Sequence, residues 1–309
     1  MKNGVAEEDE GVAFENLSIK MTGALTRGDA ERVRDLEAAC LRADNTHLKL
    51  ELDYKLGAGA QGGELLFDEL MAFDADRLVG YLGVGCFGEG STPELMGMVR
   101  PDFRGRGVFT ALHHLALTEL RRRGFRRALL LADRISVSGQ RFIEKTGAAY
   151  HHSEYEMYLR NAPSARAAPE ISLRKAVNAD APEIARQNVL YFGEERGDGD
   201  ADAKMPLPEE EEKRGMTIYL AESLGETVGK VHLQLIDGLG GIYGLGVLPE
   251  KRGRGLGRAI LTEGVLRLKA AGARDVMLQV ATGNENALGL YRSCGFETTS
   301  TMDYFELKL

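Results

Sequence analysis

The chain of 309 residues contains one segment twice, and this internal repeat constrains the fold more than any other feature of the sequence. Residues 97–109 read GMVRPDFRGRGVF, and residues 245–257 read LGVLPEKRGRGLG. Four landmarks recur at one constant separation, since 247 − 99 = 148 and the other three differences are the same. These landmarks are Val99 and Val247, Pro101 and Pro249, Gly124 and Gly272, and Gly147 and Gly295. Because chance matches would drift along the chain, the constant separation indicates duplication of a whole domain.

The duplication predicts two domains that are joined by a short linker. Residues 161–170 are rich in Pro, Ala and Ser and lack apolar periodicity, which is typical of a linker. We expect an N-terminal domain over residues 17–160 and a C-terminal domain over residues 171–309. Residues 1–16 carry an acidic run where a signal peptide would have a basic start and an apolar stretch, so they are expected to form an acidic flexible tail.

The composition narrows the classes of partner. A formal net charge of -8 argues against a nucleic-acid binder, which needs a basic surface to neutralise phosphates. No stretch approaches the roughly 20 apolar residues that a membrane helix requires. The cysteines Cys40, Cys86 and Cys294 have neither a disulfide pattern nor metal-type spacing, and His151 and His152 have no further ligand at a suitable spacing. We therefore expect a cytoplasmic protein without a metal, and a homo-oligomer stays open.

Apolar periodicity in the second copy alternates between the strand and the helix type. Strands are expected at 171–174, 217–222, 227–236, 242–248 and 276–280, with further strands up to Leu309. Helices are expected at 179–191, with Asp180 as a cap, at 256–271, and through Ala287, Leu288 and Tyr291. This order predicts an α/β fold of the α+β type, in which each domain is a twisted mixed sheet flanked by helices.

The repeated turn, rich in glycine and arginine, lies between a strand and a helix. In the second copy it covers residues 252–257, so its backbone N–H groups are the unpaired donors of a helix N-terminus. Gly255 and Gly257 keep side chains away from the main chain, and Arg252, Arg254 and Arg258 add positive charge. The turn therefore predicts a binding site for an anion such as a pyrophosphate, although a purely structural loop has the same composition.

A second motif, NENALGLYRSCGF, follows at residues 284–296. Together with the Arg/Gln-x-x-Gly-x-Gly/Ala pattern at 252–257, it resembles the GNAT superfamily of N-acetyltransferases, and the repeat makes the chain similar to the tandem-domain type. The second copy is most similar to ribosomal-protein-alanine N-acetyltransferases, over nearly all of residues 171–309. The resemblance implies that the C-terminal domain moves an acetyl group from acetyl-CoA to a primary amine, on either a small molecule or a peptide N-terminus.

The resemblance also implies a role for individual residues. The pyrophosphate of CoA would lie on residues 253–258, the pantetheine arm would pair with the strand at 245–247, and Asn284 would hydrogen-bond the cofactor. The implied cofactor-binding residues are Leu245, Gly246, Val247, Arg252, Gly253, Arg254, Gly255, Leu256, Gly257, Arg258 and Asn284. Tyr291 matches the tyrosine that protonates the departing thiolate, although helical periodicity also allows it to be a core aromatic.

The general base does not follow from the resemblance. Relatives of the ribosomal type place a glutamate five residues before the asparagine, but position 284 − 5 = 279 holds Gln279, and an uncharged amide cannot accept a proton. Glu222, His232 and a relay through bulk water stay open as alternatives. The missing carboxylate also keeps a second function open, that of a non-catalytic acyl-CoA-binding or regulatory protein.

The first copy departs further from the family pattern. Phe109 stands where Gly257 stands in the second copy, and its bulk is expected to crowd a phosphate. Ser136 and Ile143 stand at the positions of Asn284 and Tyr291. We therefore expect a degenerate N-terminal domain, with CoA binding there left open. Acidic runs at 193–202 and 209–212 precede the first long strand of the second copy and are expected either to attract a cationic acceptor or to form a solvated loop.

Overall fold

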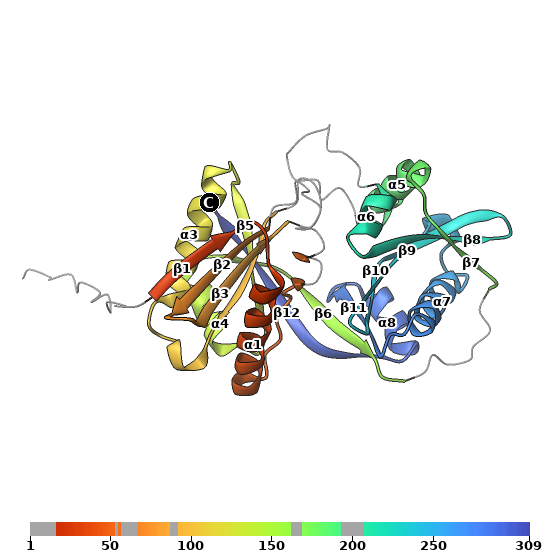
Figure 1. Cartoon of the computed structure of the whole chain (residues 1–309). Helices are drawn as coiled ribbons and strands as arrows, with labels where there is room; N and C mark the ends of the chain where they lie inside the picture. The colour runs from red at the N-terminus through yellow and green to blue at the C-terminus, as the bar shows by residue number, and fades with distance from the viewer. Residues whose placement is uncertain (1–16, 53–54, 57–66, 87–91, 162–168, 193–206) are drawn as a thin grey trace, which may run out of the picture.

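A computed structural model describes residues 17–52, 55–56, 67–86, 92–161, 169–192 and 207–309. Within these residues one mixed sheet of twelve strands runs through two lobes, in the order β1-β2-β3-β4-β5-β12-β6-β11-β10-β9-β8-β7 (Figure 1). The pairs β4–β5 and β10–β11 are parallel, and the other pairs are antiparallel. The expected tail at 1–16, the acidic run at 193–202 and most of the expected linker lie outside the described residues.

The first repeat supplies most of the lobe that we call the N-lobe. Its strands are β1 (Leu17–Thr22), β2 (Phe67–Asp74), β3 (Arg77–Gly85), β4 (Glu94–Val99), β5 (Arg127–Asp133) and β6 (Ala149–Leu159), and its helices are α1 (Arg27–Asp44), α3 (Val108–Arg122) and α4 (Val137–Thr146). Helix α1 buries Val33, Leu36 and Cys40 at helical spacing against one face of the sheet. Helices α3 and α4 cover the other face through residues such as Leu112 and Ile143.

The second repeat supplies most of the C-lobe in the same order. Its strands are β7 (Ser172–Lys175), β8 (Met216–Ser223), β9 (Glu226–Ile236), β10 (Leu239–Val247), β11 (Asp275–Ala281) and β12 (Phe296–Lys308), and its helices are α5 (Ala181–Phe192), α6 (Pro208–Lys213), α7 (Leu256–Ala270) and α8 (Glu285–Ser293). Helices α7 and α8 pack against one face of the sheet, around a core that includes Ile260 and Leu278. The smaller cluster on the other face contains Ile184 of α5 and Leu220 of β8.

Most of the expected elements of the second copy are found, with three differences. Helix α6 was not expected, and the final strands are one long strand, β12. Asp180 does not cap α5 from the helix start; its carboxylate instead accepts a hydrogen bond of 2.9 Å from the Val177 N–H at a short 3-10 turn and pairs with Arg174. The mixed sheet flanked by helices confirms the predicted fold class.

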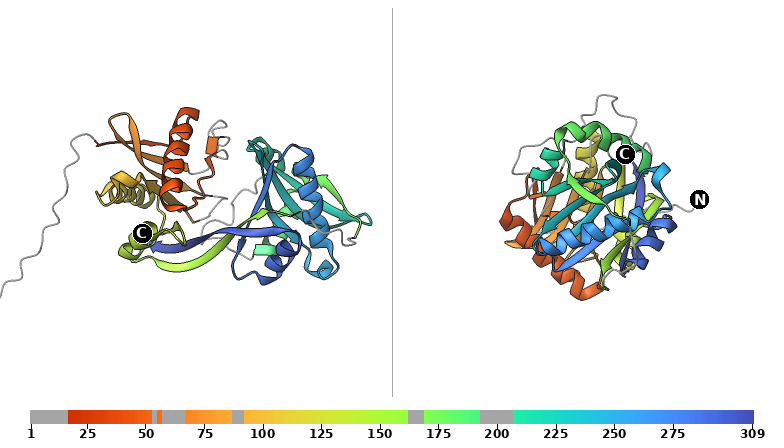
Figure 2. Two further views of the ribbon diagram at one scale, coloured as in Figure 1. Left: turned by 90° about the horizontal axis from the view of Figure 1, so that it is seen from below. Right: turned by 90° about the vertical axis from the view of Figure 1, so that its right-hand side faces the viewer.

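The last strand of each repeat pairs with the other repeat, which we call the strand exchange. Strand β12 pairs with β5 of the first repeat, from Met302 to Lys308, and β6 pairs with β11 of the second repeat, from Glu154 to Tyr158. The two exchanged strands also pair with each other and pass between the lobes (Figure 2). The exchange builds each lobe from both repeats, so neither repeat completes its own sheet.

Candidate active site

The turn before α7 has the geometry of an anion site. Gly253 and Gly255 lie in the left-handed region with φ of 74° and 79°, where a side chain would be strained. The first helical bond runs from the Ala259 N–H to the Gly255 carbonyl at 3.1 Å. Within the described part of the chain, no hydrogen bond is recorded for the N–H groups of residues 253–258. These amides and the helix dipole attract a phosphate group.

The three arginines of this turn differ in their contacts. The Arg252 guanidinium donates to the Val247 carbonyl at 3.0 Å, and the Arg258 guanidinium donates to the Ser293 carbonyl at 3.2 Å. Both side chains therefore hold the turn and α8 in place. Arg254 is exposed and makes no recorded bond to the described residues. It is the arginine best placed to pair with a bound anion.

The parallel pair β10–β11 opens into a fork beside this turn. The two strands pair only from Leu239 to Ile242 on β10, opposite Asp275 to Leu278 on β11. Beyond this point β10 continues to Val247 without β11, so residues 245–247 keep an edge that faces the fork. The structure thus brings the predicted pantetheine strand next to the predicted phosphate turn. A bound extended chain can pair with such an edge.

A β-bulge lies in β10 at the mouth of the fork. The register between β10 and β9 shifts between Tyr243 and Gly246, and Gly244 has a φ of 53°. Lys230 of β9 is fully buried, and its ammonium donates to the Gly244 carbonyl at 3.0 Å. The same ammonium lies 3.1 Å from Nε2 of His232. The bulge is therefore held by a buried lysine that the sequence analysis did not identify.

Burial dominates the protonation of this pair. It lowers the pKa of Lys230 to about 7, and burial together with the nearby lysine lowers the pKa of His232 well below its usual value. His232 is therefore a neutral imidazole at pH 7, in contact with Lys230. Glu222, the other residue considered as a base, accepts a hydrogen bond of 2.8 Å from Arg174 at the β7–β8 edge of the sheet, away from the fork.

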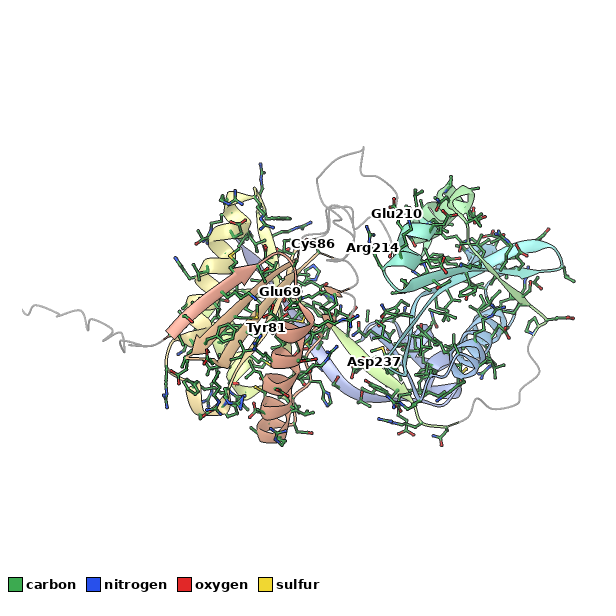
Figure 3. All side chains as sticks on the ribbon, in the orientation of Figure 1. Glu69, Tyr81, Cys86, Glu210, Arg214 and Asp237 are labelled. Carbon is green, nitrogen blue, oxygen red and sulfur yellow. The ribbon has the colours of Figure 1, made fainter. Side chains whose placement is uncertain are left out.

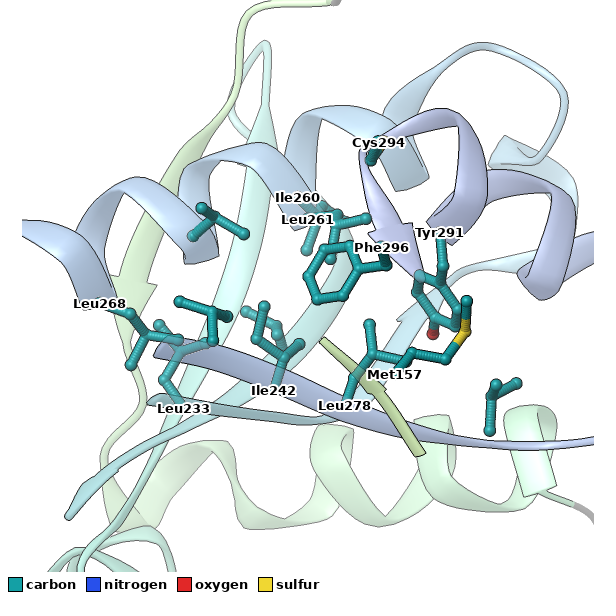
Figure 4. Packing of buried hydrophobic residues seen from close by; sticks show 14 of the residues in the cluster. Met157, Leu233, Ile242, Ile260, Leu261, Leu268, Leu278, Tyr291, Cys294 and Phe296 are labelled. Carbon is teal, nitrogen blue, oxygen red and sulfur yellow. The ribbon is translucent and has the colours of Figure 1, made fainter. Parts of the chain in front are cut away.

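Tyr291 lies on the inner face of α8, in the core between the helix and the sheet (Figure 4). Its side chain packs beside Met157 and Phe296, and only 8% of the residue is exposed. Burial raises the pKa of the phenol to about 12, so Tyr291 holds its proton at neutral pH. Leu290, the preceding residue, would lie 3.3 Å from a Cβ atom on Gly257, which shows that α8 adjoins the start of α7.

Asn284 is the N-cap of α8, where its Oδ1 accepts a hydrogen bond of 3.1 Å from the Ala287 N–H. Its counterpart Ser136 is the N-cap of α4 and accepts from the Gly139 N–H at 3.2 Å. Capping accounts for a short polar residue at this position in both repeats. The side-chain amide of Asn284 keeps its N–H donors for a further partner.

The N-lobe has a fork of its own, which opens into a large cavity. The cavity has a volume of about 1240 Å³ and extends along the turn before α3, the strands β4 and β5, and α4. Phe109 lines it, with its ring edge-on to Phe142 at 4.7 Å between ring centres and close to Gly97. His47 and Leu48, which follow α1, also line it. The cavity therefore connects the two faces of the N-lobe sheet through the fork.

Several other expected features can be placed. Residues 209–212 lie in α6, where Glu209 accepts from Asn178 at 2.9 Å, Glu211 pairs with Arg214 at 2.6 Å, and Glu212 pairs with Lys175. Most of this acidic run is thus engaged with neighbouring side chains. Among the described residues, no group of three or more His, Cys, Asp or Glu side chains is arranged to hold a metal. No helix in the same part of the chain is long and apolar enough to cross a membrane.

Comparison with known proteins agrees with the geometry. The sequence profile of the acetyltransferase (GNAT) family matches residues 30–148 and 182–296. A mycothiol acetyltransferase of Thermobispora bispora is 31% identical over 93% of this chain and 98% of its own length, and one of Saccharomonospora viridis is 30% identical over 88% and 94%.

Solved structures show the same fold. A GCN5-related N-acetyltransferase from Sphaerobacter thermophilus has a TM-score of 0.72 at 23% identity, over 95% of this chain and 96% of its own. A tandem GNAT protein from the clavulanic acid biosynthesis pathway has a TM-score of 0.70 at 16% identity, over 94% and 98%. None of these comparisons tests the similarity to ribosomal-protein-alanine N-acetyltransferases, which stays a prediction.

Proposed function

The chain belongs to the acetyltransferase (GNAT) family and is a tandem acetyltransferase, and from this premise we propose that its C-lobe transfers an acetyl group from acetyl-CoA to a small primary amine. The observation that carries the proposal is the fork between β10 and β11, which opens beside the unpaired amides of residues 253–258. In the C-lobe the fork lies beside the amides, and α8, which carries the protonated Tyr291, adjoins the start of α7.

The residues present fit acetyl-CoA. The amides of residues 253–258 and the guanidinium of Arg254 suit a pyrophosphate, since the positive φ of Gly253 and Gly255 keeps the main chain bare. The free edge of residues 245–247 suits the amide groups of a pantetheine arm. When bound, acetyl-CoA supplies an acetyl group that is activated as a thioester. Tyr291 holds the proton that a departing thiolate needs.

The chemical class of the acceptor follows from the relatives and stays part of the proposal. The relatives named above are mycothiol acetyltransferases, which points to a small-molecule amine as the acceptor here. A peptide N-terminus is the alternative that the similarity to ribosomal-protein-alanine N-acetyltransferases suggests. Both acceptors are primary amines that must lose a proton before they attack a thioester.

A second function is favoured for the N-lobe by its cavity. The turn before α3 repeats the main-chain geometry of the C-lobe turn, with φ of 72° at Gly105 and 80° at Gly107, and it lines a cavity of about 1240 Å³. Ile143 stands where the C-lobe has Tyr291, so this lobe lacks that proton donor. The N-lobe therefore suits an acyl-CoA that is bound without transfer, which would serve regulation or stability.

The full chain tests both functions in one set of measurements. Titration calorimetry with acetyl-CoA should give two sites per chain, one in each lobe. A screen of primary amines and short peptides, followed by detection of the released CoA thiol, should show transfer to at least one small amine. Binding of acetyl-CoA without transfer to any amine or peptide would favour the regulatory function over the enzymatic one. Absence of binding would contradict both.

A further inference from the structure

We propose that Glu156 is the general base of acetyl transfer in the C-lobe, brought to the fork by the strand exchange. The inference rests on the proposed function of the C-lobe and names a residue for the role that Gln279 cannot fill. Glu156 belongs to the first repeat by sequence, but its strand β6 pairs with β11 of the second repeat. The active site of the C-lobe is then completed by a residue from the other half of the chain.

The register of the exchanged strand sets the position of Glu156. In the antiparallel pair β6–β11, Glu156 lies directly opposite Gln279. Residues paired in this way have Cβ atoms about 4.5–5.5 Å apart and side chains on the same face of the sheet. Gln279 is the first residue of β11 beyond its last pair with β10, which is Leu278 with Ile242. Glu156 therefore lies one strand away from the fork, directly opposite Gln279.

The face of the sheet also suits a base. Side chains alternate along a strand, and Met157 packs into the core on the α8 side, next to Tyr291 (Figure 4). Glu156 therefore lies on the opposite face, which the segment after α1 approaches. A small cavity of about 10 Å³ on this face is lined by the polar residues His47, Lys49, Glu154, Glu156, Gln279 and Ser300 and by the apolar Leu48 and Met302. The proposed acid and the proposed base thus lie on opposite faces of the sheet.

The surroundings of Glu156 favour proton uptake. Its Oε1 accepts weak hydrogen bonds of 3.4 Å from the hydroxyl groups of Thr299 and Ser300. Burial raises the pKa of Glu156, with a smaller opposing effect from His47 and a smaller reinforcing effect from Glu51. Glu37 of α1 also feels the charge of Glu156. A carboxylate whose pKa is raised accepts a proton more readily than an exposed one.

The proton balance requires such a group. The acceptor arrives as an ammonium ion, and the Glu156 carboxylate takes one proton from it to leave a neutral amine. The amine nitrogen then forms a bond to the thioester carbonyl carbon, and the carbon–sulfur bond breaks. Tyr291 protonates the departing thiolate and regains its proton from the nitrogen of the new amide. The reaction releases one proton overall. This is the proton that Glu156 took from the acceptor, and it stays on Glu156 until it passes to solvent.

The test uses the full chain and the best acceptor from the amine and peptide screen. Glu156→Gln should lower kcat/KM by roughly 100- to 10,000-fold and remove the acidic limb of its pH profile, because the glutamine keeps the shape but cannot accept a proton. Addition of Gln279→Glu to this variant should raise kcat/KM at least tenfold and restore the acidic limb, since it places a carboxylate on the opposite strand of the pair. If Glu156 had a merely structural role, Gln279→Glu would restore neither the rate nor the acidic limb.

Glu297→Gln is the matched control. Glu297 lies on β12, which also pairs with β6, and its exposed carboxylate accepts a hydrogen bond of 3.2 Å from the Asn161 side-chain amide, so its loss should change kcat/KM by less than about threefold. Thermal melting checks that all variants fold. Undiminished transfer by Glu156→Gln, or failure of Gln279→Glu to restore a folded variant, would overturn the inference and leave the proposed function intact. Lack of transfer by the unaltered chain would instead overturn the proposed function.

Discussion

The N-lobe and the C-lobe have nearly the same glycine-rich turn, before α3 and α7, but different forks. Gly105 and Gly107 differ from Gly253 and Gly255 by only a degree or two in φ, and in each lobe an arginine donates from its Nε to the valine carbonyl that ends the preceding strand. The tyrosine that we propose as proton donor, in contrast, is present only in the C-lobe, because Ile143 stands at its position in the N-lobe. Main-chain geometry has thus been kept where side-chain chemistry has not, which suggests that the turn serves the fold as well as a ligand.

The strands that carry the forks show the difference most clearly. From the last parallel pair to the valine that ends the strand, β4 takes four steps (Leu95 to Val99) and β10 takes five (Ile242 to Val247). The extra residue is the bulge of β10, whereas β4 pairs with β3 without a shift in register. Both strands have a free edge beyond their last parallel pair, but a bulge bends its strand and increases the local twist, so the edge of β10 is shaped differently from that of β4.

The neighbouring strand also carries a different residue opposite the fork strand in each lobe. Tyr81 pairs with Met98 in the N-lobe, and Lys230 pairs with Gly246 at the corresponding position of the C-lobe. The Tyr81 hydroxyl donates to Glu69 (Figure 3), and the Lys55 ammonium lies 3.0 Å from the same carboxylate. The N-lobe thus has a closed buried network, while in the C-lobe the buried cation donates to the main chain of the bulge.

The largest difference between the two lobes should come from the proposed proton donor, which only the C-lobe has. We expect Tyr291→Phe to lower kcat by about 10- to 1000-fold, because the thiolate would leave without a proton. The matched change Ile143→Val in the N-lobe should leave kcat within about twofold. Steady-state kinetics with detection of the CoA thiol measures both. An unchanged rate for Tyr291→Phe would remove the asymmetry between the lobes and restrict Tyr291 to a role in the core.

A smaller effect should come from the turn that both lobes share. Arg254→Ala together with Gly255→Asp should weaken CoA binding to the C-lobe by about 10- to 100-fold, because a cation is lost and an anion is placed at the helix start. Arg106→Ala together with Gly107→Asp should do the same in the N-lobe. Calorimetry should then show one tight site in each variant. Two unchanged sites in either variant would mean that the turn of that lobe does not bind the phosphate.

The smallest effect concerns stability and distinguishes Lys230 from Tyr81. Because the pKa of Lys230 is about 7 in the folded chain and near 10.5 when unfolded, the unfolded chain binds the extra proton between these values, and stability rises with pH in that window. Lys230→Met lacks this gain. The free energy of unfolding of the variant should therefore fall behind that of the unaltered chain by up to about 1.4 kcal/mol for each unit of pH between pH 7 and pH 9.

Urea unfolding at several pH values measures this difference. The matched variant Tyr81→Phe should differ from the unaltered chain by a constant amount over the same range, because burial and Glu69 raise the pKa of Tyr81 well above 10. A difference for Lys230→Met that did not change with pH would show that Lys230 is not titrated in this range.

Much of the fold followed from the sequence because its signals are local. The repeat, the turn before each helix and most strands of the second copy depend on neighbouring residues, and the structure has them within a few positions. The strand exchange did not follow, since alternation of apolar residues shows which face of a strand is buried but not which strand lies beside it. By the alternation of apolar residues alone, strands β6 and β12 could pair equally well within one repeat or between the two repeats.

The sequence analysis did not identify Glu156, the bulge in β10 or Lys230. Glu156 is far from Gln279 in sequence and meets it only through the exchange. The bulge left a signal that could have been found, because the separation between copies is 147 at Leu95 and Ile242 but 148 from Val99 onward. Lys230 stands in an apolar stretch of β9, where a lone buried cation marks a position that deserves a functional test.

The order of synthesis gives the strand exchange a kinetic consequence. Strand β5 is made early, but its outer edge meets a partner only after residues 296–308 have been made. Until then the N-lobe exposes a strand edge of the kind that recruits other chains. The two halves of the chain must therefore mature together, and removal of the last strand would damage the half of the protein that was made first.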